Sequence, residues 1–97
     1  MKLIAVAELK NIKSDKNLFL LDVREHDEVA STPMAGMPFV HIPMNDVPQQ
    51  LSQIDEDKMI VVFCLAGGRS AKVCEYLISQ GYQNVSNLTG GMLAWVK

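Results

Sequence analysis

A cysteine, two glycines and an arginine lie close together in the segment Cys64-Leu65-Ala66-Gly67-Gly68-Arg69. A thiolate is a strong nucleophile, glycine lets a ligand approach the backbone closely, and a guanidinium pairs well with oxyanions. These residue types would suit covalent chemistry on a small anion with an electrophilic sulfur or phosphorus atom. A lone cysteine after a strand is more often a small buried hydrophobic residue, so this interpretation depends on the neighbours of Cys64.

The elements around this segment would place Cys64 where ligands bind in parallel sheets. Met59–Phe63 is short, apolar and rich in β-branched residues, which predicts a strand covered on both faces. From Ser70 onward the apolar residues adopt helical spacing. A helix N-terminus carries unpaired N–H groups and a partial positive charge, and a loop of N–H groups forms an anion-binding nest. We therefore expect the pKa of the Cys64 thiol to lie below the free value of about 8.5.

Three segments of the chain carry a recognisable pattern. Leu20–Glu25, Cys64–Ser70 and Asn87–Trp95 have the sequences LLDVRE, CLAGGRS and NLTGGMLAW. In this order and at this spacing they resemble the rhodanese family, whose patterns are Leu-Asp-Val-Arg-Glu, Cys-x-x-Gly-x-Arg-Ser and Leu-x-Gly-Gly-x-x-x-Trp. The resemblance covers nearly the whole chain. It implies a rhodanese-like α/β fold and a single-domain thiosulfate sulfurtransferase that needs no cofactor.

The resemblance also implies a reaction in two steps. The Cys64 thiolate attacks the outer sulfur of thiosulfate, sulfite leaves, and a thiophilic acceptor then removes the sulfur from the persulfide. We expect the loop to bind the anionic persulfide or sulfite through its backbone N–H groups. The expected substrate-binding residues are Leu65, Ala66, Gly67, Gly68, Arg69 and Ser70. Arg69 either binds the anion or shapes the loop. The resemblance implies that Asp22 and Arg24 brace the loops around the site; the alternative is a surface ion pair of little energetic consequence.

The sequence leaves the sulfur donor and acceptor open. Thiosulfate and cyanide are the family's test substrates, and thioredoxin, glutathione or a sulfur-accepting protein are further candidate acceptors. A second hypothesis makes the chain a persulfide carrier with little small-molecule turnover, and a third makes it a binding module with an unreactive cysteine. Related cysteine phosphatases and arsenate reductases bind a tetrahedral anion with a loop one residue longer, so the six residues from Cys64 to Arg69 favour sulfur chemistry.

The rest of the chain predicts one domain over residues 1–97, with strands and helices in alternation. Strands are expected at Leu3–Ile4, Leu18–Leu21, Met59–Phe63 and around Val85. Helices are expected at Ala5–Ile12, Glu25–Val29, Asn45–Ile54, from Ser70 to a C-terminal stop at Gly81, and from the Gly90-Gly91 turn through Val96. This order is typical of a small, mostly parallel sheet with helices on both faces.

The segment Ser31–Pro38 departs from the family pattern, which has a glycine-histidine turn there. Two prolines and a glycine predict a loop. Met34 and Met37 either pack into the core, the interpretation we favour, or form an adaptable surface for a partner. The gate to the site is expected in this loop if the acceptor proves to be a dedicated protein.

Composition excludes several other classes. The net charge of −2 gives no basic field for nucleic acid, and no apolar run approaches the roughly 20 residues of a membrane span. The N-terminal run Met1–Ala7 lacks a signal-peptide cleavage site, so we expect a cytoplasmic protein, although a mature exported form would have the same sequence. Oligomeric state is left open.

For the remaining side chains that could take part in chemistry, we expect structural rather than catalytic roles. Cys74 lies ten residues after Cys64 on the apolar side of the predicted helix, about three turns away and too far for a disulfide. We expect Cys74 and Trp95 in the core. His26, His41 and the cysteines lack metal-ligand spacing, so no metal site is expected, and His26 is expected to be exposed rather than a general base.

Overall fold

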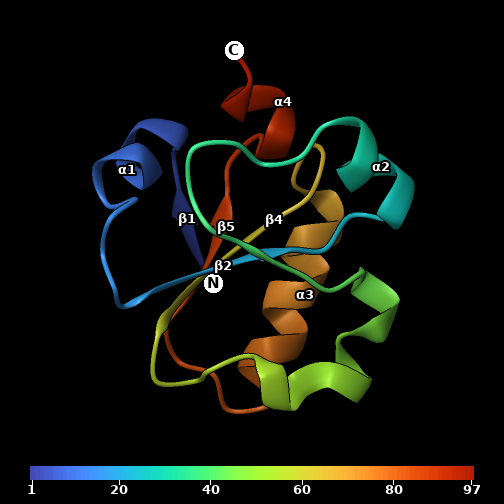
Figure 1. Ribbon diagram of the computed structural model, residues 1–97. Helices are drawn as coiled ribbons and strands as arrows, with labels where there is room; N and C mark the ends of the chain where they lie inside the picture. The colour runs from blue at the N-terminus through green and yellow to red at the C-terminus, as the bar shows by residue number, and fades with distance from the viewer.

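A computed structural model describes all residues, 1–97, and is built on one five-stranded sheet. The strands are β1 (Lys2–Ile4), β2 (Leu18–Asp22), β3 (Val40–His41), β4 (Met59–Phe63) and β5 (Val85–Leu88). They lie in the order β1-β5-β4-β2-β3, and every neighbouring pair is parallel (Figure 1). The predicted α/β fold with a small parallel sheet is therefore confirmed.

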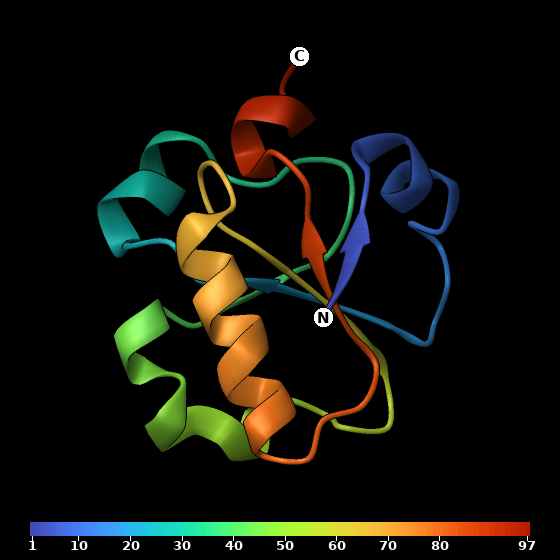
Figure 2. The ribbon, with the colours of Figure 1, turned by 180° about the vertical axis from the view of Figure 1, so that it is seen from behind.

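Helices cover both faces of this sheet. They are α1 (Val6–Asn11), α2 (His26–Ser31), α3 (Gly68–Ser79) and α4 (Gly91–Trp95), with 3₁₀ turns η1 (Met44–Asp46) and η2 (Pro48–Gln53). One core cluster joins the sheet to α3 and the two 3₁₀ turns, and the other joins it to α1, α4 and the 31–38 loop. The view from behind in Figure 2 shows α3 lying across the sheet, with the 3₁₀ turns beside it.

The central strand β4 explains why the hydrophobic core has two halves. Ile60 and Val62 belong to the α3 side, whereas Val61 and Phe63 belong to the α1 and α4 side, and all four are fully buried. Successive side chains of a strand point to opposite faces, so a continuous apolar run is what a strand covered on both faces requires. Burial of apolar surface contributes about 25 cal/mol per Å² to stability, so these four side chains stabilise the packing of helices against both faces of the sheet.

The predicted helix Asn45–Ile54 is wrong. The segment forms η1 and η2 instead, and Asn45 does not cap either of them. Pro48 is the first residue of η2, where a missing N–H has no intrahelical partner to lose, so it does not by itself break the helix. The interruption lies at Gln50, whose φ of −114° and ψ of 21° are non-helical, and the backbone hydrogen bonds from Gln50 to Val47 and from Ile54 to Leu51 join residues three apart.

The other helices follow the expectations within a residue or two. The helix after Ala5 lacks a capping side chain on that residue, but the Glu8 carboxylate accepts the Ala5 N–H at 3.0 Å and closes the first turn. Gly81 has φ +97° and ends α3 as expected. Met34 and Met37 are buried in the α1 and α4 cluster, so the core interpretation of these methionines is confirmed.

Candidate active site

Cys64 lies between the end of β4 and the start of α3, at the carboxyl edge of the sheet. Its Sγ accepts a hydrogen bond from the Gly67 N–H at 3.2 Å and one from the Ser70 N–H at 3.4 Å, and lies 3.3 Å from the Ser70 Oγ. The residue is only 1% exposed. Figure 1 shows this loop beside α2 and α4 at one end of the molecule.

These donors control the ionisation of Cys64. Burial by itself raises the pKa of the thiol because it disfavours the charged form. The Ser70 side chain and the backbone N–H groups of Ser70, Gly67 and Ala66 outweigh burial, and the pKa is lowered from its ordinary value. The loop thus forms a preorganised site for a sulfur anion.

Gly67 turns the loop so that its N–H faces the sulfur. Its φ is +116°, a conformation that L side chains rarely adopt. The Gly67 carbonyl points away from the sulfur and accepts a hydrogen bond from Asn87 Nδ2 at 3.1 Å. A substitution here would strain the backbone even though the space beside it is open enough for a Cβ.

The start of α4 holds the other side of the same loop. Met92 N–H donates to the Cys64 carbonyl at 2.9 Å, and Leu93 N–H donates to the Leu65 carbonyl at 3.1 Å. A Cβ on Gly91 would clash with the Cys64 carbonyl oxygen and lie 2.6 Å from the Leu65 carbonyl oxygen. The Gly-Gly pair therefore lets α4 approach the loop closely and turn its carbonyls away from the sulfur.

The expected loop residues Leu65, Ala66 and Gly68 form the exposed rim of the site. Among the backbone–backbone hydrogen bonds, none uses the N–H groups of these three residues or of Arg69 as donors. The N–H groups of Leu65, Gly68 and Arg69 are thus free for an anion bonded to Sγ or lying beside it, whereas the Ala66 N–H already acts on the sulfur. Binding of substrate by these residues stays a prediction.

Arg69 faces α2. Its two terminal nitrogens donate to the Glu28 carboxylate at 2.6 and 2.8 Å, with the two side chains 32% and 26% exposed. Hydrogen bonding from Arg69 lowers the pKa of Glu28 to about 2, and the pKa of Arg69 is raised by the same contact. In this arrangement Arg69 connects α2 to the start of α3, and both of its terminal nitrogens are already hydrogen-bonded to Glu28. The sequence analysis missed Glu28, because an acidic residue on a short exposed helix gives no signal of its own.

Asp22 and Arg24 form an ion pair at the end of β2 that is almost completely buried. Arg24 donates from Nε and Nη2 to the Asp22 carboxylate, at 3.1 and 2.9 Å, and the two side chains are 1% exposed for Arg24 and 0% for Asp22. Val23 N–H donates to the Phe63 carbonyl at 3.1 Å, directly before Cys64. The alternative of a surface pair is wrong, and the location agrees with a bracing role. His41 Nε2 lies 2.6 Å from the Arg24 carbonyl oxygen and helps to fix that turn.

Asn87 was not singled out by the sequence analysis, although it borders a recognised motif. It is 6% exposed on β5, and its Oδ1 accepts the Ser70 hydroxyl at 2.6 Å. A polar side chain inside a short buried strand was the available signal. The two residues extend the hydrogen-bond network of the sulfur into the sheet.

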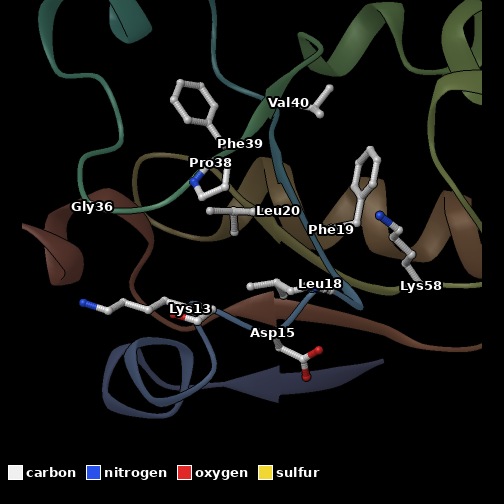
Figure 3. A pocket seen from close by; sticks show the side chains of 12 residues that line it. Lys13, Asp15, Leu18, Phe19, Leu20, Gly36, Pro38, Phe39, Val40 and Lys58 are labelled. Carbon is white, nitrogen blue, oxygen red and sulfur yellow. The ribbon is translucent and has the colours of Figure 1, made fainter.

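A large hollow of the surface lies elsewhere. A groove of about 700 Å³ runs along the start of β2 and is lined by Leu18, Phe19, Phe39 and three lysines, with no residue of the Cys64 loop (Figure 3). It is therefore not the site of thiol chemistry. No group of three or more metal-ligating side chains is present, and no helix is long and apolar enough to cross a membrane.

Comparison with known proteins gives a consistent picture. YtwF of Bacillus subtilis, which carries a provisional sulfurtransferase name, is 46% identical over 98 residues, covering 98% of this chain and 90% of YtwF. The sulfur carrier YrkF of the same organism, also provisionally named, is 33% identical over 86 residues, covering 89% of this chain and 45% of YrkF. The thiosulfate sulfurtransferase GlpE of Coxiella burnetii is 27% identical over 94 residues, covering 97% and 86%.

A solved structure and a family model extend this result. The crystal structure of a rhodanese-like domain protein from Staphylococcus aureus matches with a TM-score of 0.88 and 36% identity, covering 98% of this chain and 91% of that one. The model of the rhodanese-like domain matches residues 5–97. With the match spanning nearly every residue and the cysteine loop at the expected edge of the sheet, this chain belongs to the rhodanese family.

Proposed function

We propose that this chain is an enzyme that transfers sulfane sulfur from thiosulfate to a thiophilic acceptor through a persulfide on Cys64. The supporting observation is the Cys64 sulfur itself, which accepts two backbone N–H bonds within a loop where the N–H groups of Leu65, Gly68 and Arg69 are free. Among the relatives, GlpE bears the name of a thiosulfate sulfurtransferase.

In the first step the Cys64 thiolate attacks the outer sulfur of thiosulfate. A new S–S bond forms at Cys64 while the S–S bond of thiosulfate breaks, and its electron pair leaves with sulfite. The negative charge of the thiolate is then carried by the outer sulfur of the persulfide. The N–H groups of Leu65, Ala66, Gly68 and Arg69 are the proposed donors to that charge.

In the second step a nucleophile such as cyanide or a thiolate attacks the outer sulfur. Its bond to that sulfur forms, the persulfide bond breaks, and Cys64 leaves as a thiolate that the Gly67 and Ser70 N–H groups stabilise. No proton is transferred in either step, so the site needs no separate general base. Thioredoxin, glutathione and sulfur-accepting proteins are candidate acceptors in the same step.

The alternative is a persulfide carrier that delivers its sulfur to one protein partner and turns over small molecules poorly. The low exposure of Cys64, 1%, favours this alternative because a recessed sulfur is hard for a free acceptor to reach. The similarity to the provisionally named carrier YrkF also favours it.

Thiosulfate:cyanide sulfur transfer tests the proposal, measured as thiocyanate formed. We expect transfer with the native chain and with Cys74→Ser, and none with Cys64→Ser. Intact mass after thiosulfate treatment alone separates the hypotheses further. A gain of one sulfur without release to cyanide supports the carrier, whereas a chain that gains no sulfur contradicts both.

A further inference from the structure

Ser70 and Asn87 form a buried polar chain that ends at the reactive sulfur. The Ser70 Oγ lies 2.6 Å from Asn87 Oδ1, 3.2 Å from the Gly67 carbonyl oxygen and 3.3 Å from Cys64 Sγ. The two residues are 0% and 6% exposed, so water does not substitute freely for these contacts. These hydrogen bonds link the sulfur to β5, the strand beside β4.

The network fixes which way the Asn87 amide points. The Gly67 carbonyl 3.1 Å away can only accept, so the Asn87 Nδ2 must face it. Oδ1 then faces the Ser70 hydroxyl, and because Oδ1 can only accept, Ser70 must donate to it. The reversed amide would place two carbonyl oxygens against each other and is excluded.

The hydroxyl of Ser70 has a single proton. Asn87 Oδ1 at 2.6 Å is a closer acceptor for it than the Gly67 carbonyl at 3.2 Å. While the hydroxyl donates to Asn87, the Ser70 oxygen offers only lone pairs to Cys64. That arrangement suits a neutral sulfur, either a thiol that donates its S–H or the inner sulfur of a persulfide. A thiolate instead needs a donor, which the same hydroxyl becomes if it rotates toward Sγ.

We infer that Asn87 is a positioning residue for sulfur transfer, whose amide oxygen accepts the Ser70 hydrogen bond while the Cys64 sulfur is neutral and releases it when that sulfur becomes a thiolate. The inference rests on the proposed function. When an acceptor attacks the persulfide, the S–S bond breaks and its electron pair returns to Cys64. The hydroxyl then turns toward the sulfur, and its proton stays bonded to Ser70 throughout.

One consequence is measurable without any sulfur donor. A bond from Ser70 to Asn87 that exists only with a neutral sulfur opposes ionisation of Cys64. Without the Asn87 acceptor, the Ser70 hydroxyl can donate to the neutral Gly67 carbonyl at 3.2 Å or to the Cys64 sulfur at 3.3 Å, and a charged thiolate is the stronger acceptor. Removing Asn87 therefore favours the Cys64 thiolate, provided that Ser70 is present to donate. We expect the ratio of thiolate to thiol to rise by about threefold to tenfold, the range that one hydrogen bond typically supports.

The test is a double-mutant cycle read from the pH dependence of Cys64 alkylation by iodoacetamide, with the labelled peptide identified by mass. The variants are Asn87→Leu, Ser70→Ala and both together. Asn87 also donates a hydrogen bond to the Gly67 carbonyl, and the Gly67 N–H donates to the Cys64 sulfur. Loss of Asn87 can therefore shift the pKa of Cys64 through Gly67 as well, and this effect is present with and without Ser70. We expect the Asn87→Leu shift to be more negative with Ser70 present than in the Ser70→Ala background, by about threefold or more in the ratio of thiolate to thiol.

Equal shifts in the two backgrounds, zero included, would overturn the inference, because Asn87 would then act only through Gly67. Asn87→Ala serves as a second variant if the leucine perturbs folding, with slow labelling of buried Cys74 as the criterion of a folded chain. Alkylation requires no thiosulfate, so this result is independent of whether thiosulfate is the donor. With cyanide as acceptor, Asn87→Leu is also expected to speed sulfur release from the isolated persulfide.

Discussion

The two cysteines of this chain have opposite environments only ten residues apart. Cys64 accepts N–H bonds from Gly67 and Ser70 on its sulfur, and the pKa of its thiol is lowered. Cys74 lies in the middle of α3, fully buried against the core, and burial raises the pKa of its thiol to about 12. Both are almost free of solvent contact, so exposure does not distinguish them. The hydrogen-bond donors directed at the sulfur do.

Exchanging each cysteine for serine gives the sharpest form of this comparison. Cys64→Ser is expected to abolish sulfur transfer, by at least about a thousandfold, because the hydroxyl is a far weaker nucleophile and cannot form the persulfide. Cys74→Ser is expected to keep transfer and to lose stability, by about 1–3 kcal/mol, because a hydroxyl replaces a thiol in an apolar site. Thiocyanate formation and urea unfolding measure the two effects. Loss of transfer in a folded Cys74→Ser chain would contradict the division of roles.

The pH dependence of alkylation tests the pKa difference directly. We expect Cys64 to reach its plateau rate at a lower pH than a free cysteine does. At a pH of about 8, a thiol with a pKa of about 12 is ionised in about one molecule in ten thousand, so Cys74 is expected to stay unlabelled. Because folding favours the neutral Cys74, the stability that this thiol supports is present below its unfolded pKa and is lost as pH rises toward about 12. Equal labelling of both cysteines at that pH in the folded chain would contradict the comparison.

Removing one partner of the buried ion pair is expected to weaken the frame around Cys64. Asp22→Asn leaves the Arg24 guanidinium buried without its carboxylate, which typically costs about 3–5 kcal/mol. Such a loss is a large part of the stability of a small domain. Unfolding by urea measures the change, with Asp46→Asn, on an exposed turn residue, as the matched control. A change below about 1 kcal/mol would indicate that the pair does not brace the site.

Gly91 and Gly36 both have positive φ, but only Gly91 is closely packed, so alanine at each position distinguishes the effect of a steric clash from that of backbone strain. Gly91→Ala is expected to displace the Cys64 loop and lose most transfer, with about 2–4 kcal/mol of stability, because its Cβ would lie 2.6 Å from the Leu65 carbonyl. Gly36→Ala, at φ +91° with nothing within 4 Å, is expected to cost about 1 kcal/mol and to keep transfer. Cys64 alkylation and the transfer assay measure both. Similar activities of the two variants would mean that α4 does not shape the loop.

Parts of this comparison were predictable from sequence because they depend on short-range patterns. The apolar run before Cys64 predicted β4, and the helical spacing after Ser70 placed Cys74 in the core. The roles of Glu28 and Asn87 depend on contacts across 41 and 17 residues of chain, which no local spacing encodes. The burial of Asp22 and Arg24 was missed for a related reason: a charged pair looks like a surface pair until the helices that cover it are known.

The helix expected at Asn45–Ile54 failed for a different reason. The segment does have an apolar face at helical spacing, since Val47 and Ile54 are in the core and Leu51 packs against it. The pattern predicted the buried positions correctly but not the type of helix, because the non-helical backbone at Gln50 leaves no trace in the hydrophobic spacing. The periodicity therefore predicted which residues of this segment are buried, but not its backbone conformation.

The Arg69–Glu28 pair gives the smallest expected effect on stability. Glu28→Gln is expected to change the unfolding free energy by less than about 1 kcal/mol, because a partly exposed pair is screened by water and salt. Folding lowers the pKa of Glu28 to about 2, so the pair contributes above the unfolded pKa and is lost as pH falls through about 2. If the pair holds the loop, Glu28→Gln lowers kcat of sulfur transfer with KM for thiosulfate little changed. If Arg69 binds the anion, releasing it from Glu28 lowers KM instead, so steady-state kinetics of this variant beside the native chain separate the two roles left open by the sequence.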